Sequence, residues 1–468
     1  MWDFGKYSGN VAVITESGER IPYSALAEYC SALVHHIPYR CLVFNLCKNE
    51  LGSLVGYAAF LNANIVPLML KADLDEGLLL ELIKAYKPDY LNVPSEMAEK
   101  FAECKVVYEN LGYALLKTAF DSVYPLHDDL ALLLTTSGST GSPKLVRQSY
   151  KNIESNTKSI VEYLSLDESE RTITTLPMNY TYGLSIINTH LSVGASIILT
   201  DKALMQKEFW QQLKEYEVTS FGGVPYTYEM LKRLRIERMD LPALKCVTQA
   251  GGKLSPELHE KFAKWAADTG KKFVVMYGQT EATARMSYLP PEKALEKCGS
   301  IGVAVPGGKF SLIGNDGCEI TSPETVGELV YYGENVTMGY AECGADLANG
   351  DELHGRLESG DMAKFDADGC YYIVGRKKRF LKIFGNRVNL EETENLLKSA
   401  FDGCDFACGG VDDKMHVFLT REEVKDDVLA FLVKTLKFNA VAFKVVFINS
   451  IPRNDVGKVL YSELAKVV

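Results

Sequence analysis

The sequence has no long uninterrupted apolar run and no basic N-terminal leader. Its most apolar long stretch, Leu51 to Leu70, contains Asn62, Asn64 and Pro67, which a membrane-spanning helix would not favour. We interpret this stretch as a buried helix followed by a strand. At the N-terminus, no basic stretch leads into an apolar run, so it does not resemble a secretory signal. The sequence therefore predicts no membrane span.

The 11 cysteines are scattered and form neither a disulfide framework nor a zinc-site spacing. Cys404 and Cys408 lie four residues apart, but no second pair is nearby. Free thiols are typical of a reducing compartment. We therefore predict a cytoplasmic protein.

An excess of positive charge is also missing. The chain has 50 basic and 61 acidic side chains and a net charge of −11. Nucleic acids and anionic membranes favour clustered Lys and Arg, so neither is expected as the main partner. An anionic substrate would need a local basic site or a bound metal.

The length of 468 residues favours more than one domain, and 47% apolar with 24% charged residues is typical of a globular protein. Over most of the first 375 residues, helical and strand-like patterns alternate. Residues 149–166 have helical periodicity, for example, and residues 195–200 form a short β-rich run. This alternation predicts an α/β architecture with a largely parallel sheet.

After about residue 299 the pattern changes, because Gly and Pro become frequent and short strand candidates follow without long helices between them. We predict a small β-rich subdomain at about 299–377. The basic cluster GRKKRFLK at 375–382 then leads into a final piece with one clear helix, 389–401, among short strands. The predicted domains are therefore a large N-terminal α/β domain, 1–377, and a smaller α+β C-terminal domain, 378–468.

The sharpest local feature is LLLTTSGSTGSPK, Leu132 to Lys144, in which an apolar run ends in Ser, Thr and Gly residues. Small residues let backbone N–H groups approach an anion, and the lysine adds positive charge. Pro143 precedes the lysine, so the segment is not a Walker A loop. The chain also has no G-x-G triplet, which excludes a Rossmann turn. A phosphate-binding loop is favoured over a plain surface loop.

The segment TTSGSTGSPK, 135–144, resembles the phosphate-binding signature of the adenylate-forming superfamily of AMP-binding enzymes. This superfamily contains acyl-CoA and aryl-CoA synthetases, adenylation domains of peptide synthetases, and luciferases. Its other signatures recur in the same order up to residue 458. The resemblance implies ATP as a substrate and a mobile C-terminal domain. It assigns nucleotide binding in this loop to Thr136, Ser137, Gly138, Ser139, Thr140, Gly141 and Lys144.

A second signature is YGQTE, 277–281, which follows the strand-like KKFVVM. The resemblance implies that Tyr277 packs against adenine beside Gly278 and that the Thr280 hydroxyl meets the α-phosphate as a catalytic group. It also implies that Glu281 binds Mg²⁺, and a hard carboxylate suits that ion. Taken alone, the segment is equally typical of a tight turn before a helix.

Two further elements complete the implied nucleotide site. In AGGK, 250–253, the main chain at Gly251 and Gly252 would pass beside adenine and the acyl group, although a simple turn remains an alternative. In SGD, Asp361 would accept hydrogen bonds from the ribose hydroxyls, with Arg376 beside it.

The C-terminal region carries the implied catalytic lysines. Lys458, in IPRNDVGK, resembles the lysine that neutralises charge at the carboxylate and the α-phosphate. Lys382 would serve a second, thioester-forming step, with Gly385 lining the passage for a pantetheine arm. Lys378 would be the hinge of the small C-terminal domain, which would present two different faces to the active site in turn.

In the region of the expected acyl pocket, the sequence departs from the family pattern. Tyr180 stands where many acyl-CoA and aryl-CoA ligases have a histidine, and no acidic residue occurs between Thr172 and Thr200. A buried substrate ammonium would then lack a carboxylate partner, so an α-amino acid is disfavoured. The pocket candidates, which could equally fill the core, are Tyr180, Tyr182, Gly223 and Ala250.

The leading hypothesis is a two-step ligase that uses ATP, Mg²⁺ and either CoA or a carrier-protein phosphopantetheine. A small carboxylic acid would become acyl-AMP with release of pyrophosphate, and a thiol would then displace AMP. No carrier-protein domain is visible in the sequence, so a carrier would be a separate partner. The alternatives are an adenylate delivered to a non-thiol acceptor and a non-catalytic nucleotide-binding protein of the same fold.

Overall fold

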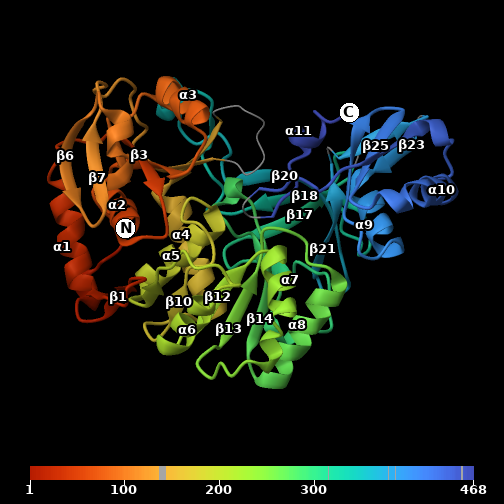
Figure 1. The fold of residues 1–468 in the computed structure, drawn as a ribbon, viewed down its shortest axis with the longest axis horizontal. Helices are drawn as coiled ribbons and strands as arrows, with labels where there is room; N and C mark the ends of the chain where they lie inside the picture. Colours follow the sequence, from red (N-terminus) through yellow and green to blue (C-terminus); the bar gives the residue numbers. More distant parts are fainter. Residues whose placement is uncertain (136–143, 315, 378, 385, 455–456) are drawn as a thin grey trace. The chain divides into compact units, whose positions relative to one another are not determined.

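The structure, a computed structural model, describes residues 1–135, 144–314, 316–377, 379–384, 386–454 and 457–468 (Figure 1). The chain forms two compact units. The first contains Met1–Lys309 and Tyr331–Leu357, and the second contains Phe310–Val330 and Glu358–Val468. The predicted β-rich segment, about 299–377, is divided between the two units, and its place in an N-terminal domain 1–377 stays a prediction. A mobile domain that begins at 378 stays a prediction.

One large sheet of the first unit has the strand order β19-β9-β8-β4-β3-β5-β7-β6 in the described residues. Strands β3, β4, β5 and β8 pair in parallel, and β9 joins β8 in antiparallel orientation. The central strands are mostly apolar and buried because parallel sheets are covered on both faces. The bounds are β3 Leu42–Cys47, β4 Val66–Lys71, β5 Tyr90–Pro94, β6 Lys105–Asn110, β7 Tyr113–Lys117, β8 Leu130–Thr135, β9 Leu145–Ser149 and β19 Gly339–Ala341.

The other large sheet has the order β16-β15-β14-β13-β12-β10-β11-β1-β2 in the same part of the chain. Its central strands, from β14 across to β1, pair in parallel. Helices α6, α7 and α8 lie beside strands β12–β14 (Figure 1). The strand bounds are β1 Val11–Ile14, β2 Arg20–Pro22, β10 Arg171–Ile173, β11 Ser196–Ile198, β12 Ser220–Gly223, β13 Cys246–Gln249, β14 Lys272–Tyr277, β15 Ser287–Tyr288 and β16 Val303–Ala304.

The helices of the first unit follow the predicted alternation with strands, so the expected α/β class is confirmed. The stretch from Leu51 forms a buried helix and then β4, as its pattern indicated. Among the described residues, no helix has the length and apolar character needed to cross a membrane. The helix bounds are α1 Tyr23–Val34, α2 Leu51–Asn62, α3 Glu76–Tyr86, α4 Tyr150–Leu164, α5 Thr181–Val193, α6 Lys207–Glu215, α7 Pro225–Arg233 and α8 Pro256–Thr269.

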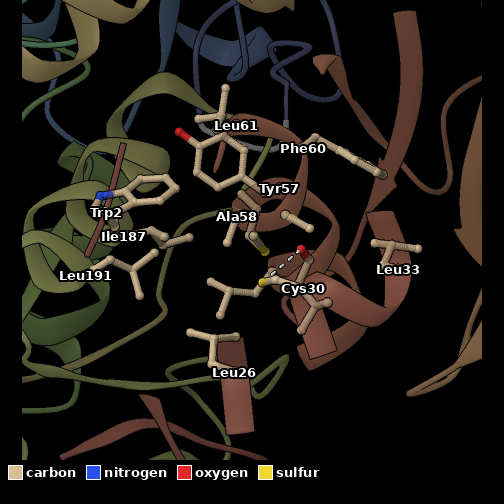
Figure 2. Close-up of a cluster of buried hydrophobic side chains, with 14 of the residues drawn as sticks. Trp2, Leu26, Cys30, Leu33, Tyr57, Ala58, Phe60, Leu61, Ile187 and Leu191 are labelled. Carbon is tan, nitrogen blue, oxygen red and sulfur yellow. Dashed lines mark hydrogen bonds between the residues drawn. The ribbon is translucent and has the colours of Figure 1, made fainter. Parts of the chain in front are cut away.

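A buried cluster joins the N-terminal segment to helices α1, α2 and α5 (Figure 2). The ring of Trp2 lies 5.6 Å from that of Tyr57, and Leu26, Ile187 and Leu191 are buried in the same cluster. Burial of such large side chains contributes about 1.5–3 kcal/mol each. This core fixes α5, and α5 begins within the predicted acyl-pocket segment.

The second unit is built from smaller sheets. Its four-stranded sheet has the order β17-β18-β20-β21, followed by a β22-β23 hairpin and a β24-β25-β26 sheet. The strand bounds are β17 Lys309–Ile313, β18 Gly327–Tyr332, β20 Arg356–Phe365, β21 Tyr371–Arg376, β22 Phe380–Ile383, β23 Asn386–Asn389, β24 Phe406–Val411, β25 Lys414–Leu419 and β26 Phe443–Phe447. The helix bounds are α9 Leu390–Ala400, α10 Lys425–Leu436 and α11 Tyr461–Leu464.

Candidate active site

The predicted phosphate loop joins two paired strands. Strand β8 is buried up to Leu134, and Thr135 at its end pairs with Leu145 at the start of β9. The intervening candidates lie outside the described residues; they are Thr136, Ser137, Gly138, Ser139, Thr140 and Gly141. The sheet therefore fixes both ends of the segment, while its binding role stays a prediction.

Lys144, the last residue of the signature, lies against a tyrosine. Its Nζ is 3.7 Å from the ring centroid of Tyr340 and 4.0 Å from Oε1 of Glu342. The Lys144 side chain is 35% exposed, so both contacts are screened by solvent and are weak. The ammonium can therefore exchange these contacts for a phosphate.

The same tyrosine connects Lys144 to the predicted metal ligand. The Tyr340 hydroxyl donates a hydrogen bond of 2.8 Å to Oε1 of Glu281. Burial and the charge of Glu281 raise the pKa of Tyr340, so its hydroxyl stays a donor. No sequence signal identified Tyr340, because its contact with Glu281 depends on the pairing of β19 with β9.

The turn that carries Glu281 is tightly constrained. Tyr277 ends β14, and Thr280–Ala282 form a single 3₁₀ turn. A Cβ at Gly278 would lie 1.7 Å from the carbonyl oxygen of Ala284, so glycine is required there. The residues that close the turn, Thr283 and Ala284, have φ of 53° and 95°. Such conformations are costly for non-glycine residues and are typical of functional turns.

Neighbouring segments hold this turn through its backbone. Gln148 in β9 donates from Nε2 to the carbonyl oxygen of Thr280 at 3.3 Å. The backbone N–H of Thr337 donates to the carbonyl oxygen of Glu281 at 3.0 Å, and Nδ2 of Asn335 donates to that of Ala282 at 2.8 Å. The threonine and glutamate side chains thus start from a fixed backbone.

Glu281 fits a magnesium ion that also binds substrate phosphates. Among the described residues, no group of three or more His, Cys, Asp or Glu side chains could hold a metal. Mg²⁺ in nucleotide enzymes usually takes one or two carboxylates and completes its shell with phosphates and water. Because Tyr340 engages one oxygen of Glu281, the other can coordinate such an ion.

The AGGK segment begins at the end of β13 and lies beside Tyr180. Gly251 has a φ of +82°, and a Cβ there would lie 2.6 Å from the Tyr180 hydroxyl oxygen. Gln249 donates from Nε2 to the carbonyl oxygen of Gly252 at 2.8 Å. The N–H of Ala250, which is buried, donates to the carbonyl of Gly223 at 3.1 Å. The structure therefore brings Gly251 and Tyr180 together and links Ala250 to Gly223.

Tyr182 packs deeper than Tyr180. It is 3% exposed, and its hydroxyl shares a hydrogen bond of 2.7 Å with Thr248. Burial raises the pKa of Tyr180 to about 12, so its hydroxyl is neutral. For Tyr182 the structure favours a role in core packing.

A buried arginine that the sequence patterns did not identify lies over Tyr182. The guanidinium of Arg285 is 5.0 Å from the Tyr182 ring centroid, and its Nη1 donates to the Tyr163 hydroxyl at 3.0 Å. Its Nε is buried without a hydrogen-bond partner, and within the described residues no carboxylate pairs with it. A buried cation without an anion is costly. Its neighbourhood therefore carries uncompensated positive charge.

In the second unit, Asp361 and Arg376 are cross-strand partners in β20 and β21. Arg376 Nε lies 3.2 Å from Oδ1 of Asp361, and the Asp361 side chain is buried. The strand pairing thus places the two predicted ribose-binding residues side by side. Their contact with ribose stays a prediction.

The predicted catalytic lysines lie on separate short segments of this unit. Lys382 is exposed on β22, where its backbone N–H donates to Asp412 at 2.8 Å. Lys458 is half-buried, and its N–H donates to Oδ1 of Asn454 at 2.9 Å. The predicted hinge and thiol-passage residues, Lys378 and Gly385, lie outside the described residues.

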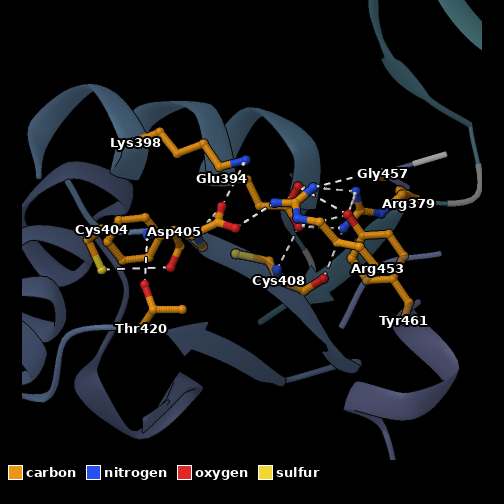
Figure 3. Close-up of polar contacts among 11 residues, drawn as sticks. Arg379, Glu394, Lys398, Cys404, Asp405, Cys408, Thr420, Arg453, Gly457 and Tyr461 are labelled. Carbon is orange, nitrogen blue, oxygen red and sulfur yellow. Dashed lines mark hydrogen bonds and ion pairs between the residues drawn. The ribbon is translucent and has the colours of Figure 1, made fainter. Parts of the chain in front are cut away.

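An ion pair between a half-buried arginine and a buried glutamate, near the segment that carries Lys458, was not predicted (Figure 3). Arg379 donates to Glu394 at 2.7 Å and to the Tyr461 hydroxyl at 2.8 Å. On the other side of Lys458 in the chain, Arg453 pairs with Asp405 at 2.5 Å. The segment that carries the lysine is therefore anchored at both ends.

Comparisons with known proteins identify the family of the chain. The family model of the AMP-binding enzymes matches residues 6–341, so the chain belongs to the AMP-binding enzyme family. It is 30% identical to an oxalate–CoA ligase of Arabidopsis thaliana over 350 residues, which cover 71% of this chain and 66% of that enzyme. It is 29% identical to a 2-succinylbenzoate–CoA ligase of Bacillus licheniformis over 348 residues, which cover 72% and 70% of the two chains.

Solved structures of two adenylate-forming enzymes share the fold. The O-succinylbenzoate coenzyme A synthetase of Bacillus subtilis, in complex with AMP, matches with a TM-score of 0.79 at 19% identity and covers 98% of this chain and 97% of its own. ATP-bound MatB from Rhodopseudomonas palustris matches with a TM-score of 0.77 at 22% identity over 99% and 98%. The family match thus confirms the predicted superfamily, and the structural matches confirm the predicted α/β fold.

Proposed function

We propose that this enzyme activates a carboxylic acid with ATP and transfers the acyl group to a thiol. A carboxylate oxygen attacks the α-phosphorus, the bond to pyrophosphate breaks, and acyl-AMP forms. The thiol sulfur of CoA or of a carrier-protein phosphopantetheine then attacks the acyl carbon, and AMP leaves as the thiol proton is lost.

One observation carries this proposal: Lys144, Tyr340 and Glu281 form a continuous chain of contacts beside the phosphate-loop strands. These contacts bring the candidate phosphate-binding cation, just before β9, close to the candidate metal-binding carboxylate on the turn after β14. Thr280 precedes Glu281 on the same turn, and we assign its hydroxyl to the α-phosphate.

The roles of the remaining residues follow from their chemistry. Mg²⁺ bound through Glu281 would offset phosphate charge. Asp361 and Arg376 bind the ribose, and Tyr277 with Gly251 and Gly252 borders adenine. Lys458 neutralises the charge that develops at the α-phosphate.

The second step uses the residues around the hinge. Lys382 acts in thioester formation, Gly385 lines the thiol passage, and Lys378 is the hinge of a mobile C-terminal domain. The relatives whose names state a reaction are CoA ligases, which favours CoA over a carrier protein as the thiol. Free thiols at all 11 cysteines support a cytoplasmic location.

The predicted acyl-pocket segment restricts the acid. Residues 172–200 supply no acidic side chain. An α-ammonium group bound beside this segment would therefore lack a carboxylate partner there, which is costly. We therefore favour an acid without an amino group.

The test is ATP–pyrophosphate exchange across matched sets of mono-, di- and aminocarboxylic acids, followed by AMP release with CoA or carrier protein. Exchange with at least one acid, and AMP release that requires a thiol, are expected. Thiol-independent AMP release would favour another acceptor. ATP binding without exchange for any acid would favour a non-catalytic protein and contradict the proposal.

A further inference from the structure

Tyr340 lies outside the recognised signatures but contacts two charged groups of the site. Its ring faces Lys144, with Nζ 3.7 Å from the centroid, and its hydroxyl donates to Glu281 at 2.8 Å. We propose that Tyr340 is a positioning residue for the magnesium-binding carboxylate. The inference rests on the proposed function and deepens it, because it names the residue through which the metal site is oriented.

The backbone of Tyr340 is held firmly enough for this task. Strand β19 pairs with β9, with Tyr340 opposite Val146 and Gly339 opposite Arg147. The fully buried Arg147 also donates from Nε to the carbonyl oxygen of Tyr340 at 2.9 Å and pairs with Glu352 at 2.6 Å. The side chain that carries the Tyr340 hydroxyl therefore extends from a strand whose backbone is held in place.

Glu281 needs such a partner. Its backbone is fixed by a single 3₁₀ turn, but its carboxylate stands at the end of three rotatable bonds. A hydrogen bond to Oε1 selects one orientation and so directs the other oxygen. Partners that orient a metal ligand in this way typically contribute 10–100-fold to metal affinity.

The ring of Tyr340 contacts Lys144, and this contact is separate from the hydrogen bond to Glu281. In the structure the ammonium lies over the ring and near Glu342, which together keep it beside the phosphate-loop strands. Both contacts are partly exposed and can be exchanged for a phosphate. Tyr340→Phe keeps the ring and removes only the hydroxyl, so it isolates the effect on Glu281.

The experiment measures Mn²⁺ binding by electron paramagnetic resonance in the presence of α,β-methylene ATP. Tyr340→Phe is expected to weaken Mn²⁺ binding about 10- to 100-fold. The affinity for α,β-methylene ATP without metal should not change. In a Glu281→Gln background the same substitution should have no further effect, because the tyrosine acts through that carboxylate.

Tyr150→Phe is the matched control. This half-buried tyrosine donates to the Leu61 carbonyl at 3.0 Å, so the variant loses a comparable hydrogen bond away from Glu281. It should lose similar thermal stability and keep wild-type Mn²⁺ affinity. Wild-type Mn²⁺ affinity in Tyr340→Phe, or an equal loss with and without Glu281, would overturn the inference. The proposed function fails in a different way: the wild-type enzyme would then show no pyrophosphate exchange with any acid.

Discussion

Glu281 and Lys458 are assigned to the same reaction but are held in different ways. Glu281 stands on a turn whose carbonyl groups accept hydrogen bonds from β9 and from residues 335–337, and Tyr340 engages its side chain. Lys458 stands on a short segment held mainly by Asn454 and by flanking anchors in its own unit.

The difference matches what each group must do. Residues that receive the nucleotide must be in place before it arrives, and strand ends of a large sheet supply that rigidity. A lysine that acts in one half-reaction and leaves in the next is better placed on a small unit. The following variants test this division, from the largest expected effect to the smallest.

Lys458→Ala should lower carboxylate-dependent pyrophosphate exchange about 100- to 1,000-fold, because charge at the α-phosphate would no longer be neutralised. Thioester formation from supplied acyl-AMP should be largely intact. The control is Lys466→Ala, which removes an exposed lysine paired with Glu463 at 2.8 Å. Unchanged exchange in Lys458→Ala would remove the role assigned to this lysine.

Gly278→Ala should destabilise the first unit by about 3 kcal/mol, because the added Cβ would overlap the Ala284 carbonyl. Urea unfolding measures the loss. Gly9→Ala is the control, since a Cβ there meets no atom within 4 Å. Equal stability of the two variants would show that the turn is not as constrained as its geometry indicates.

Lys382→Ala should produce the reverse of the Lys458 pattern. Exchange should be retained, while thioester formation from acyl-AMP should slow about tenfold, which corresponds to about 1.4 kcal/mol of transition-state interaction. Single-turnover measurements of each half-reaction separate the two. If the rates of both half-reactions fall equally, the two lysines do not act in separate half-reactions.

Tyr461→Phe should lower the free energy of unfolding of the second unit by about 1 kcal/mol. The substitution removes the hydroxyl that hydrogen-bonds Arg379 and Glu394, while the ring stays under the Arg379 guanidinium. The exposed Tyr226 gives a control variant, Tyr226→Phe, with no expected loss. An equal change in the urea midpoint of the two variants would contradict the role of Arg379, Glu394 and Tyr461 as an anchor.

Local patterns predicted much of this molecule. The apolar run from Leu51 and the run that forms β8 have periodicities and flanking residues that specify their elements without knowledge of their neighbours. Asp361 and Arg376 were expected side by side from the resemblance, and antiparallel pairing of β20 with β21 brings them together.

Contacts that depend on distant strand pairing could not be predicted. Tyr340 meets Glu281 only because β19 lies against β9, and nothing near either residue in the sequence encodes that pairing. Arg285 follows a recognised signature, but its burial over Tyr182 depends on how α4 and α5 pack. The division of the β-rich segment between the two units is likewise a property of tertiary contacts.

The central claim is attack of the acid on the α-phosphorus, and isotope transfer tests it most directly. With an acid that supports exchange, labelled with ¹⁸O in its carboxylate, one labelled oxygen should appear in AMP after thioester formation and none in pyrophosphate. Label in pyrophosphate or inorganic phosphate, with unlabelled AMP, would place the attack on another phosphorus and contradict the account.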